Sequence, residues 1–146
     1  PFLEDFLKEN NLNYKNIKNT IIVNGPGSFT WVRTTVLAIN TINFITKNNL
    51  TPISYFDLFN DFPIVKSSSK RDCFYKDSKD SKIEIKLNED ISSELKNKKI
   101  SKIYWEADLE DIEIIEKIDY FDIIKKIKLL ELKKVEPLYI KKPNIS

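Results

Sequence analysis

The stretch TIIVNGPGSFT, residues 20–30, contains both glycines of this 146-residue chain. Its first four residues form a β-branched run that is typical of a short buried strand. Residues 29–47 contain neither glycine nor proline and predict one long helix, with Ser28 in the N-cap position. Glycine is used where the backbone needs positive φ or where another group approaches closely. Residues 24–28 therefore predict a tight turn between strand and helix.

This turn has two interpretations. It directs backbone N–H groups and a helix N-terminus towards one point, an arrangement that suits a phosphate. The stretch has neither the lysine and spacing of a P-loop nor the G-x-G-x-x-G fingerprint. In the second interpretation, Gly25 and Gly27 only allow the helix to pack closely against the strand. The residues leave both interpretations open.

The long helix carries two apolar stripes, whereas a surface helix needs only one. The second stripe predicts burial on both sides, either inside a larger fold or against a partner. A short amphipathic helix, ending near Asn10 and Asn11, is also predicted at the start of the chain. We assign the first stripe to the core, while the pattern also allows the reverse assignment. The two stripes are Phe29, Val32, Val36 and Ile39, and Trp31, Ala38, Ile42 and Ile45.

Beyond the long helix, predicted strands and helices are mixed, which indicates an α/β or α+β fold of two subdomains. Residues 138–140, after Pro137, are expected to be extended. The strictly alternating residues 82–87 predict a half-exposed strand. Further strands are predicted at residues 62–65, 73–75 and 100–105, and helices at 55–60, at 90–97 with Asp90 as the cap, and at 119–130.

The composition excludes several classes of site. The chain has no histidine, so it can form neither a Ser-His-Asp nor a Cys-His nucleophile and no His-ligated metal site. The single cysteine, Cys73, rules out an internal disulfide and is interpreted as structural. The net charge of +2 gives no bulk field that favours nucleic acid or an anionic membrane. Without a spanning stretch or a signal peptide, a cytoplasmic protein is expected.

Residues 25–30, followed by Val32 and Arg33, resemble the Gly-Pro-Gly-Ser-Phe-Thr-Gly-x-Arg signature of the TsaB (YeaZ-like) family. Members of this family take part in making threonylcarbamoyladenosine in tRNA. Residues 52–58, 64–75 and 136–143 resemble further family segments in the same order, the last being similar to a Glu-Pro-x-Tyr-Leu-Arg element. The resemblance singles out Gly25, Pro26, Gly27, Ser28, Phe29, Thr30 and Arg33 at the turn, and Glu136, Pro137 and Tyr139 near the end.

The chain also departs from the family pattern. Trp31 and Thr35 stand where the family has glycines, and residues 68–70 replace an Asp-Ala-Arg turn. The resemblance implies an α/β, actin-like (ASKHA, RNase H-like) fold of two subdomains. Residues 1–60 would be the remnant of the first lobe, and residues 61–146 the second lobe with a terminal helix and a C-terminal extended segment. The family's opening strands are missing before Pro1, through truncation or loss, and the absence of an initial Met favours truncation.

The resemblance implies a function as well. The chain is expected to be a non-catalytic scaffold subunit of the threonylcarbamoyl-transferring complex, with no cofactor or metal. It would pair with a TsaD-type catalytic paralogue, help to dock a TsaE-type ATPase and touch tRNA only indirectly; a homodimer in the absence of the paralogue stays open. Family members pair through their first two helices. The matching residues are Phe2, Phe6, Leu7, Trp31, Ala38, Ile42 and Ile45.

Two other functions stay open. An ASKHA-type nucleotide-binding phosphotransfer enzyme would place phosphates at Gly25 and Gly27 and hold Mg²⁺ with acidic residues, of which Asp57 and Asp61 are nearest in sequence. A tRNA-binding module would use a lysine-rich strip near Tyr139, although a solvated face is the preferred interpretation of that strip. Its lysines are Lys125, Lys126, Lys128, Lys133, Lys134, Lys141 and Lys142.

Overall fold

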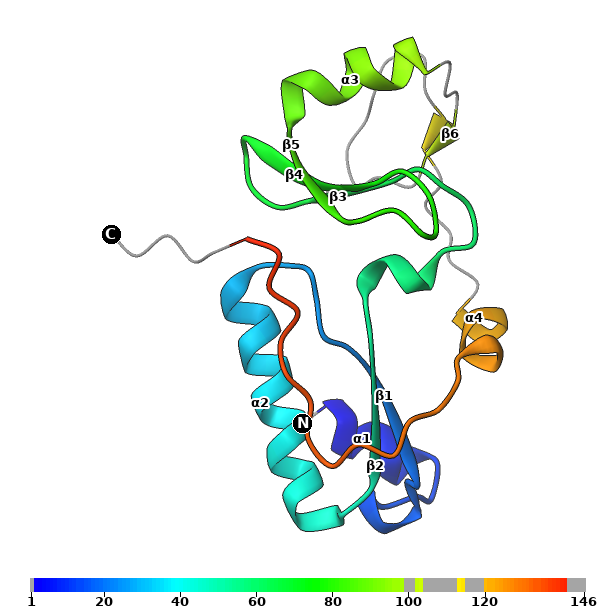
Figure 1. Ribbon diagram of the computed structural model, residues 1–146. Coiled ribbons are helices and arrows are strands. Elements are labelled where there is room, and N and C mark those ends of the chain that lie inside the picture. Colours follow the sequence, from blue (N-terminus) through cyan, green and yellow to red (C-terminus); the bar gives the residue numbers. More distant parts are fainter. Residues whose placement is uncertain (1, 99–101, 104–112, 115–119, 142–146) are drawn as a thin grey trace.

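The computed structural model describes residues 2–98, 102–103, 113–114 and 120–141 (Figure 1). These residues form a mixed α/β structure of two units, each built around a small sheet. The predicted strand at residues 100–105 lies mostly outside the described residues. Its described part is β6 (Lys102–Ile103), which pairs in parallel with β7 (Glu113–Ile114).

The first unit is a parallel β–α–β arrangement. Strand β1 (Asn19–Val23) pairs with β2 (Asn49–Ile53), and the long helix α2 (Phe29–Thr46) connects them. The predicted strand and long helix are therefore confirmed, but the sequence did not indicate β2, because its residues alternate poorly and include Pro52. Helix α2 ends where Lys47 adopts a left-handed conformation with φ of 58°. The helix α1 (Phe2–Glu9) and the 3₁₀ turn η1 (Tyr14–Asn16) precede β1.

The second unit is an antiparallel sheet in the order β3-β4-β5, with α3 packed beside it. The three predicted strands are confirmed in this region. Helix α3 begins at Asn88, so the prediction that Asp90 caps it is wrong: Leu87 holds the N-cap position and Asp90 lies in the first turn, where its charge favours the helix dipole. The elements are η2 (Tyr55–Leu58), β3 (Ile64–Ser67), β4 (Asp72–Lys76), β5 (Glu84–Leu87), α3 (Asn88–Asn97) and α4 (Tyr120–Lys126).

Residues 127–141, which we call the C-terminal strap, return to the first unit along β2 and α2 (Figure 1). Helix α4 ends at Lys126 and not at the predicted residue 130. The Leu130 N–H donates instead to Thr51 Oγ1 at 2.8 Å. The N–H of Leu50 donates to the carbonyl of Leu132 at 2.8 Å, forming an antiparallel bridge. The strap contacts both units, because Ile127 and Ile140 pack against the cluster that contains Phe74, and Lys141 pairs with Asp72 of β4. The division of the chain at residue 60 stays a prediction.

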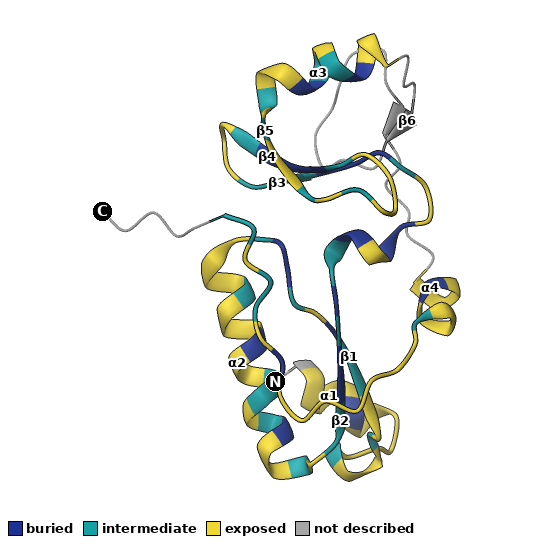
Figure 2. Ribbon diagram, viewed as in Figure 1, coloured by how far each residue is buried: buried dark blue, intermediate teal, exposed yellow. Residues whose placement is uncertain are grey.

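Two clusters of buried side chains form the core, and Figure 2 shows buried positions concentrated along β2 and in the middle of the β3-β4-β5 sheet. One cluster joins β1, α2, β2 and the strap through Ile22, Val36, Leu50 and Val135. The other connects the two units and consists of Ile53, Phe56, Leu58, Phe59, Ile64, Phe74 and Ile123. Cys73 is fully buried in β4, and burial raises the pKa of its thiol to about 11, which agrees with a structural role.

An ionic network ties α3 to the sheet. Lys98 Nζ lies 2.6 Å from Asp77 Oδ1 and 3.0 Å from Glu94 Oε1, and Lys86 also pairs with Glu94. The buried Tyr75 hydroxyl donates a hydrogen bond of 2.6 Å to Asp77 Oδ1. Hydrogen bonds from Lys98 and Lys86 hold the pKa values of Asp77 and Glu94, respectively, below their usual range.

This network predicts acid sensitivity. Because the pKa of Glu94 is depressed in the folded protein, its contribution to stability is complete at neutral pH and is lost as the pH falls below about 4.5, the ordinary value. Replacing Glu94→Gln should lower the free energy of unfolding by about 1 kcal/mol at pH 7 and by much less at pH 3. Urea unfolding at both pH values measures this, with Glu89→Gln at an exposed position of α3 as the control. An equal loss for Glu94→Gln at both pH values would contradict the role of the charge.

Candidate functional site

The glycine turn holds the C-terminal strap. Gly25 has φ of 134°, and a Cβ added there would lie 2.5 Å from the carbonyl oxygen of Leu138. The Leu138 N–H donates to the carbonyl of Asn24 at 2.7 Å, and Asn24 Nδ2 donates to the carbonyl of Glu136 at 2.8 Å. The carbonyl of Gly25 accepts from the Tyr55 N–H at 2.7 Å. The turn therefore connects β1 to α2 along the chain, and these hydrogen bonds join it to η2 and to the strap.

The two segments on which the family resemblance depends thus lie side by side, although more than a hundred residues separate them. The ring of Phe29 stacks on that of Tyr139, with centroids 5.1 Å apart. Phe29 is 38% exposed, so assigning it to the core was wrong: as the first residue of α2 it lies at the edge, against the strap. Pro137 is half-buried within the strap.

The close-packing interpretation of the glycines agrees with this geometry, but the packed group is the strap. The Leu138 carbonyl beside Gly25 would repel a phosphate at that point. Cavities of about 160 and about 340 Å³ remain next to the turn. The ammonium group of Lys141 on the lining of the first pairs with Asp72, and that of Lys66 on the lining of the second lies 3.9 Å from the centroid of the Tyr55 ring. The hydrogen bond from Lys141 keeps the pKa of Asp72 below its usual value.

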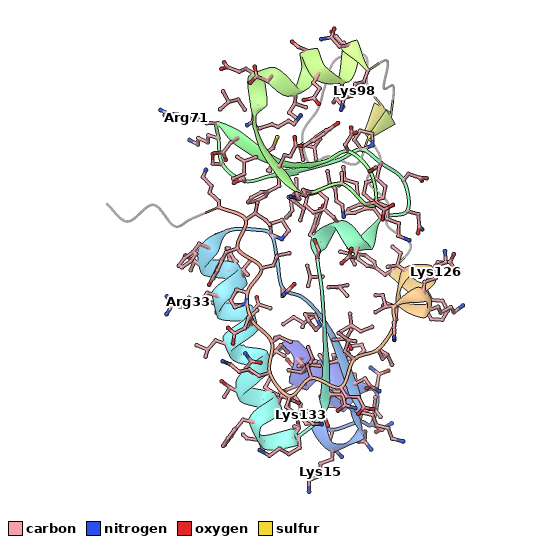
Figure 3. The ribbon with its side chains drawn as sticks, in the orientation of Figure 1. Lys15, Arg33, Arg71, Lys98, Lys126 and Lys133 are labelled. Carbon is pink, nitrogen blue, oxygen red and sulfur yellow. The ribbon has the colours of Figure 1, made fainter. Side chains whose placement is uncertain are left out.

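The other turn residues are placed as follows. Pro26 is buried, and Gly27 is half-buried with Val32 Cγ2 3.2 Å from an added Cβ. Ser28 occupies the N-cap position, but its side chain makes no capping hydrogen bond, so only its predicted position is confirmed. Thr30 and Arg33 are exposed in the first two turns of α2, and Figure 3 shows Arg33 on the outer side of the helix.

Helix α2 faces three different environments. Val36, 3% exposed, and Ile39 pack on the β1–β2 sheet. On the next side, Asn40 forms a pair of hydrogen bonds with the backbone of Val135, donating to its carbonyl at 2.9 Å and accepting from its N–H at 3.0 Å. Asn43 Nδ2 donates to the carbonyl of Lys133 at 2.9 Å. The remaining side faces outward (Figure 2).

The outward side includes most of the second apolar stripe. Trp31 is 74% exposed, Ile45 is 78% exposed, and Ala38 between them is exposed. Ile42 is only half-buried, because it lines a small cavity that Leu3 of α1 also lines. The prediction that this stripe turns away from the core therefore agrees with the structure at Trp31, Ala38 and Ile45.

The residues predicted on α1 do not share one environment. Phe6 is 50% exposed, whereas Leu7 is 4% exposed. The assignment of Leu7 to an interface surface is therefore wrong, because the amphipathic helix turns this side chain inward. Nothing is described for the side chain of Phe2.

Asn40 and Asn43 hold the strap against α2, and the sequence analysis missed both of them. Asparagine is a poor helix former, and two asparagines three residues apart fall on one side of a helix. This spacing could have indicated the contact, because amide side chains on one side of an apolar helix favour hydrogen bonds to the backbone of a segment packed against that side. Lys133 reinforces the contact, since its Nζ lies 2.6 Å from Asn49 Oδ1 and 3.1 Å from the Lys47 carbonyl at the end of α2.

Several residues that the phosphotransfer and tRNA-binding alternatives would use make contacts within this chain. Asp57 Oδ2 accepts from the Ser54 N–H at 2.8 Å in a capping box, and Asp61 is exposed. Lys134 pairs with Glu136 at 2.7 Å, and Lys126 with Asp122 at 3.7 Å. Lys125 lies over an aromatic ring of α4, Lys128 is exposed, and Lys142 lies outside the described residues. The described residues include no group of three or more His, Cys, Asp or Glu side chains that could hold a metal ion.

Comparison with known proteins shows the fold. The structure superposes on a crystal structure of an uncharacterized protein with similarity to peptidase YEAZ, from Pseudomonas aeruginosa, with a TM-score of 0.64 and 9% sequence identity, over 95% of this chain and 81% of that one. The chain has a YeaZ-like fold. YeaZ from Pseudomonas aeruginosa itself gives a TM-score of 0.48 at 13% identity, over 59% of this chain and 47% of that chain. No family model and no curated protein sequence matches the chain.

At 9% identity the YeaZ-like fold is recognised by its arrangement of elements rather than by its residues. The resemblance of residues 25–30 to the family signature agrees with this fold. No described helix of the YeaZ-like fold is both long and apolar enough to cross a bilayer.

The geometry of the turn predicts which glycine matters. Gly25→Ala should lower the free energy of unfolding by at least about 2 kcal/mol, because the new Cβ would collide with a backbone carbonyl and Ala disfavours φ of 134°. Gly27→Ala is the matched control: it meets only the movable side chain of Val32, so its cost should be below about 1 kcal/mol. Urea unfolding of the two variants compares them. Similar losses at both positions would show that the strap does not depend on Gly25.

Proposed function

We propose that this chain is a non-catalytic scaffold subunit of the complex that transfers threonylcarbamoyl groups to tRNA. In this role it binds a TsaD-type catalytic paralogue as a heterodimer, helps to dock a TsaE-type ATPase, and meets tRNA only through its partners. The role implies a cytoplasmic location. The proposal is supported by the YeaZ-like fold, by the signature residues at the glycine turn and by the surface of α2.

The nearly uncharged outward side of α2 is the observation that carries the proposal. Charged residues make up 32% of the whole chain, yet Arg33 is the sole charged residue among the 18 residues of α2. Large apolar side chains on this helix nevertheless reach exposures of 74% and 78% at Trp31 and Ile45. An exposed helix with one charge in 18 residues is expected where another protein covers it.

The spacing of the exposed residues suits a partner helix. Trp31, Ala38 and Ile45 repeat every seven residues, and this stripe extends over about 21 Å of the helix axis. Small side chains at Thr34 and Thr35 lie between the first two and allow close approach. A heptad stripe with large ends and a small centre favours a second helix packed lengthwise, with Trp31 as an aromatic anchor.

Helix α1 extends the same contact surface. Its Leu3 and the Ile42 side chain line one cavity of about 80 Å³, so α1 lies beside the outward stripe of α2. Phe6 of the same helix is 50% exposed and is therefore also available for a contact. A stable heterodimer buries about 1,600 Å² of surface in total, and two helices side by side offer a larger contact surface than α2 alone.

The alternative functions receive less support. A phosphotransfer enzyme would need phosphate groups to approach Gly25, but the Leu138 carbonyl occupies that point. Asp57 is bonded to its own turn. A tRNA-binding strip needs lysines that are free to meet phosphates, whereas Lys133, Lys134 and Lys141 contact groups of this chain.

Ile45→Lys should abolish heterodimer formation without unfolding the protein. Ile45 is 78% exposed, so the monomer loses little packing, while a lysine in an apolar helix contact leaves a desolvated charge. The measurement is size-exclusion chromatography with light scattering on an equimolar mixture with the TsaD-type paralogue of the same organism. A charge at Ile42 is a poorer test, because this side chain also packs inside the chain.

Phe44→Lys is the matched control for this experiment. Phe44 is the next residue towards the N-terminus, is 74% exposed, and lies about 100° further round the helix. The control should pair with the paralogue as the unmodified chain does, and both variants should melt within a few degrees of it. If Ile45→Lys still forms the one-to-one complex, or if the unmodified chain forms none, the proposed scaffold role is wrong.

A further inference from the structure

A second apolar surface lies on α4 and the start of the strap, apart from the outward side of α2. Between residues 120 and 132 only Ile123 is buried, and it belongs to the core cluster between the two units. Figure 2 shows this stretch as mostly exposed. Its exposed apolar side chains are Tyr120, Phe121, Ile124, Leu129, Leu130 and Leu132.

The α4 part of this surface is continuous. Tyr120, Phe121 and Ile124 fall within about 100° of the helix circumference, next to one another, and are 55%, 72% and 50% exposed. Ile123 points to the core on another side and anchors the helix. A seven-residue helix therefore uses one side chain for folding and presents three large apolar ones outward.

Positive charge borders the same surface. Lys125, Lys126 and Lys128 lie in or just after the last turn of α4, and they outnumber the two acidic residues between residues 120 and 132, Asp122 and Glu131. Lys125 Nζ lies 4.3 Å from the centroid of the Phe121 ring, so the cation sits directly on the apolar surface. Lysines near a helix C-terminus also favour the helix dipole, which accounts for their charge but not for the exposed rings.

We propose that this surface, which we call the α4 surface, docks an acidic amphipathic helix of a partner protein. The partner's aliphatic side chains would cover Phe121 and Ile124, and its carboxylates would meet Lys125 and Lys128. The pairing is one of charge complementarity around an apolar centre, the arrangement that directs specific protein contacts. The proposal is independent of the scaffold role, because it uses no residue of α1 or α2.

Nucleic acid and membrane suit this surface less well. A single-stranded nucleic acid stacks its bases on aromatic rings and binds cations with its phosphates, but it does not cover aliphatic side chains such as Ile124, Leu129 and Leu132. An interfacial membrane helix needs a long amphipathic stretch, whereas α4 has seven residues and its Ile123 side is occupied by the core. An acidic helix uses both the aliphatic and the cationic features.

Fluorescence anisotropy with labelled probes tests the proposal. One probe is a helical peptide of about 15 residues with leucine at every third or fourth position and glutamate elsewhere; a second has lysine in place of glutamate. Phosphatidylserine vesicles and unmodified tRNA are the other two probes. We expect the glutamate peptide to bind at least tenfold more tightly than the lysine peptide, and more tightly than vesicles or tRNA.

Variants locate the binding. Phe121→Ser should weaken binding of the glutamate peptide at least tenfold, and Lys125→Glu should weaken it and reduce its dependence on salt. Leu37→Ser is the matched control, since Leu37 is 65% exposed on α2 and away from this surface. Circular dichroism checks that each variant is folded. Equal binding of the two peptides, preference for vesicles or tRNA, or unchanged binding by Phe121→Ser would each overturn the proposal.

Discussion

The close contact between Gly25 and the carbonyl of Leu138 is the constraint on which the rest of the structure depends. Only a residue without a side chain allows the strap to approach the turn at this point. The close approach lets Asn24 bond the strap twice, accepting from the Leu138 N–H with its backbone carbonyl and donating to the Glu136 carbonyl with its side-chain amide. The strap lies along α2 on the side of this contact that precedes Leu138 in the chain, and it completes the core through Val135. A parallel pair of strands alone would leave α2 and β2 poorly covered, because parallel sheets need packing on both faces.

Helix α2 presents a different chemistry on each of its three sides. Its core side is conventional, with Val36 against the sheet. Its strap side uses amides instead of apolar side chains, because the strap offers backbone groups that must be bonded when buried. The third side makes neither kind of contact and carries Arg33 as its single charged residue. So few charges are costly for a free surface and reasonable for a shared one.

The two exposed apolar surfaces differ in their chemistry. The outward side of α2 has large apolar side chains at its ends and small side chains between them, and suits a neutral, closely packed helix. The α4 surface is aromatic and aliphatic with lysines at its border, and suits an acidic partner. The chain has almost balanced charges overall, with 24 basic and 22 acidic residues, so these properties come from local arrangement rather than from net charge.

The sequence alone determined the local elements and the special turn. Period and composition predicted β1, α2, β3, β4 and β5, because each has a strong apolar pattern and clear breakers at its ends, and the two glycines marked a site of close approach. The tertiary structure alone decided what approaches that turn, which faces of α2 are covered, and that Leu7 points inward while Phe29 stacks on Tyr139. The reason is physical: a local pattern specifies which side chains share a face. The group that covers the face comes from a segment about a hundred residues away, and no local pattern records it.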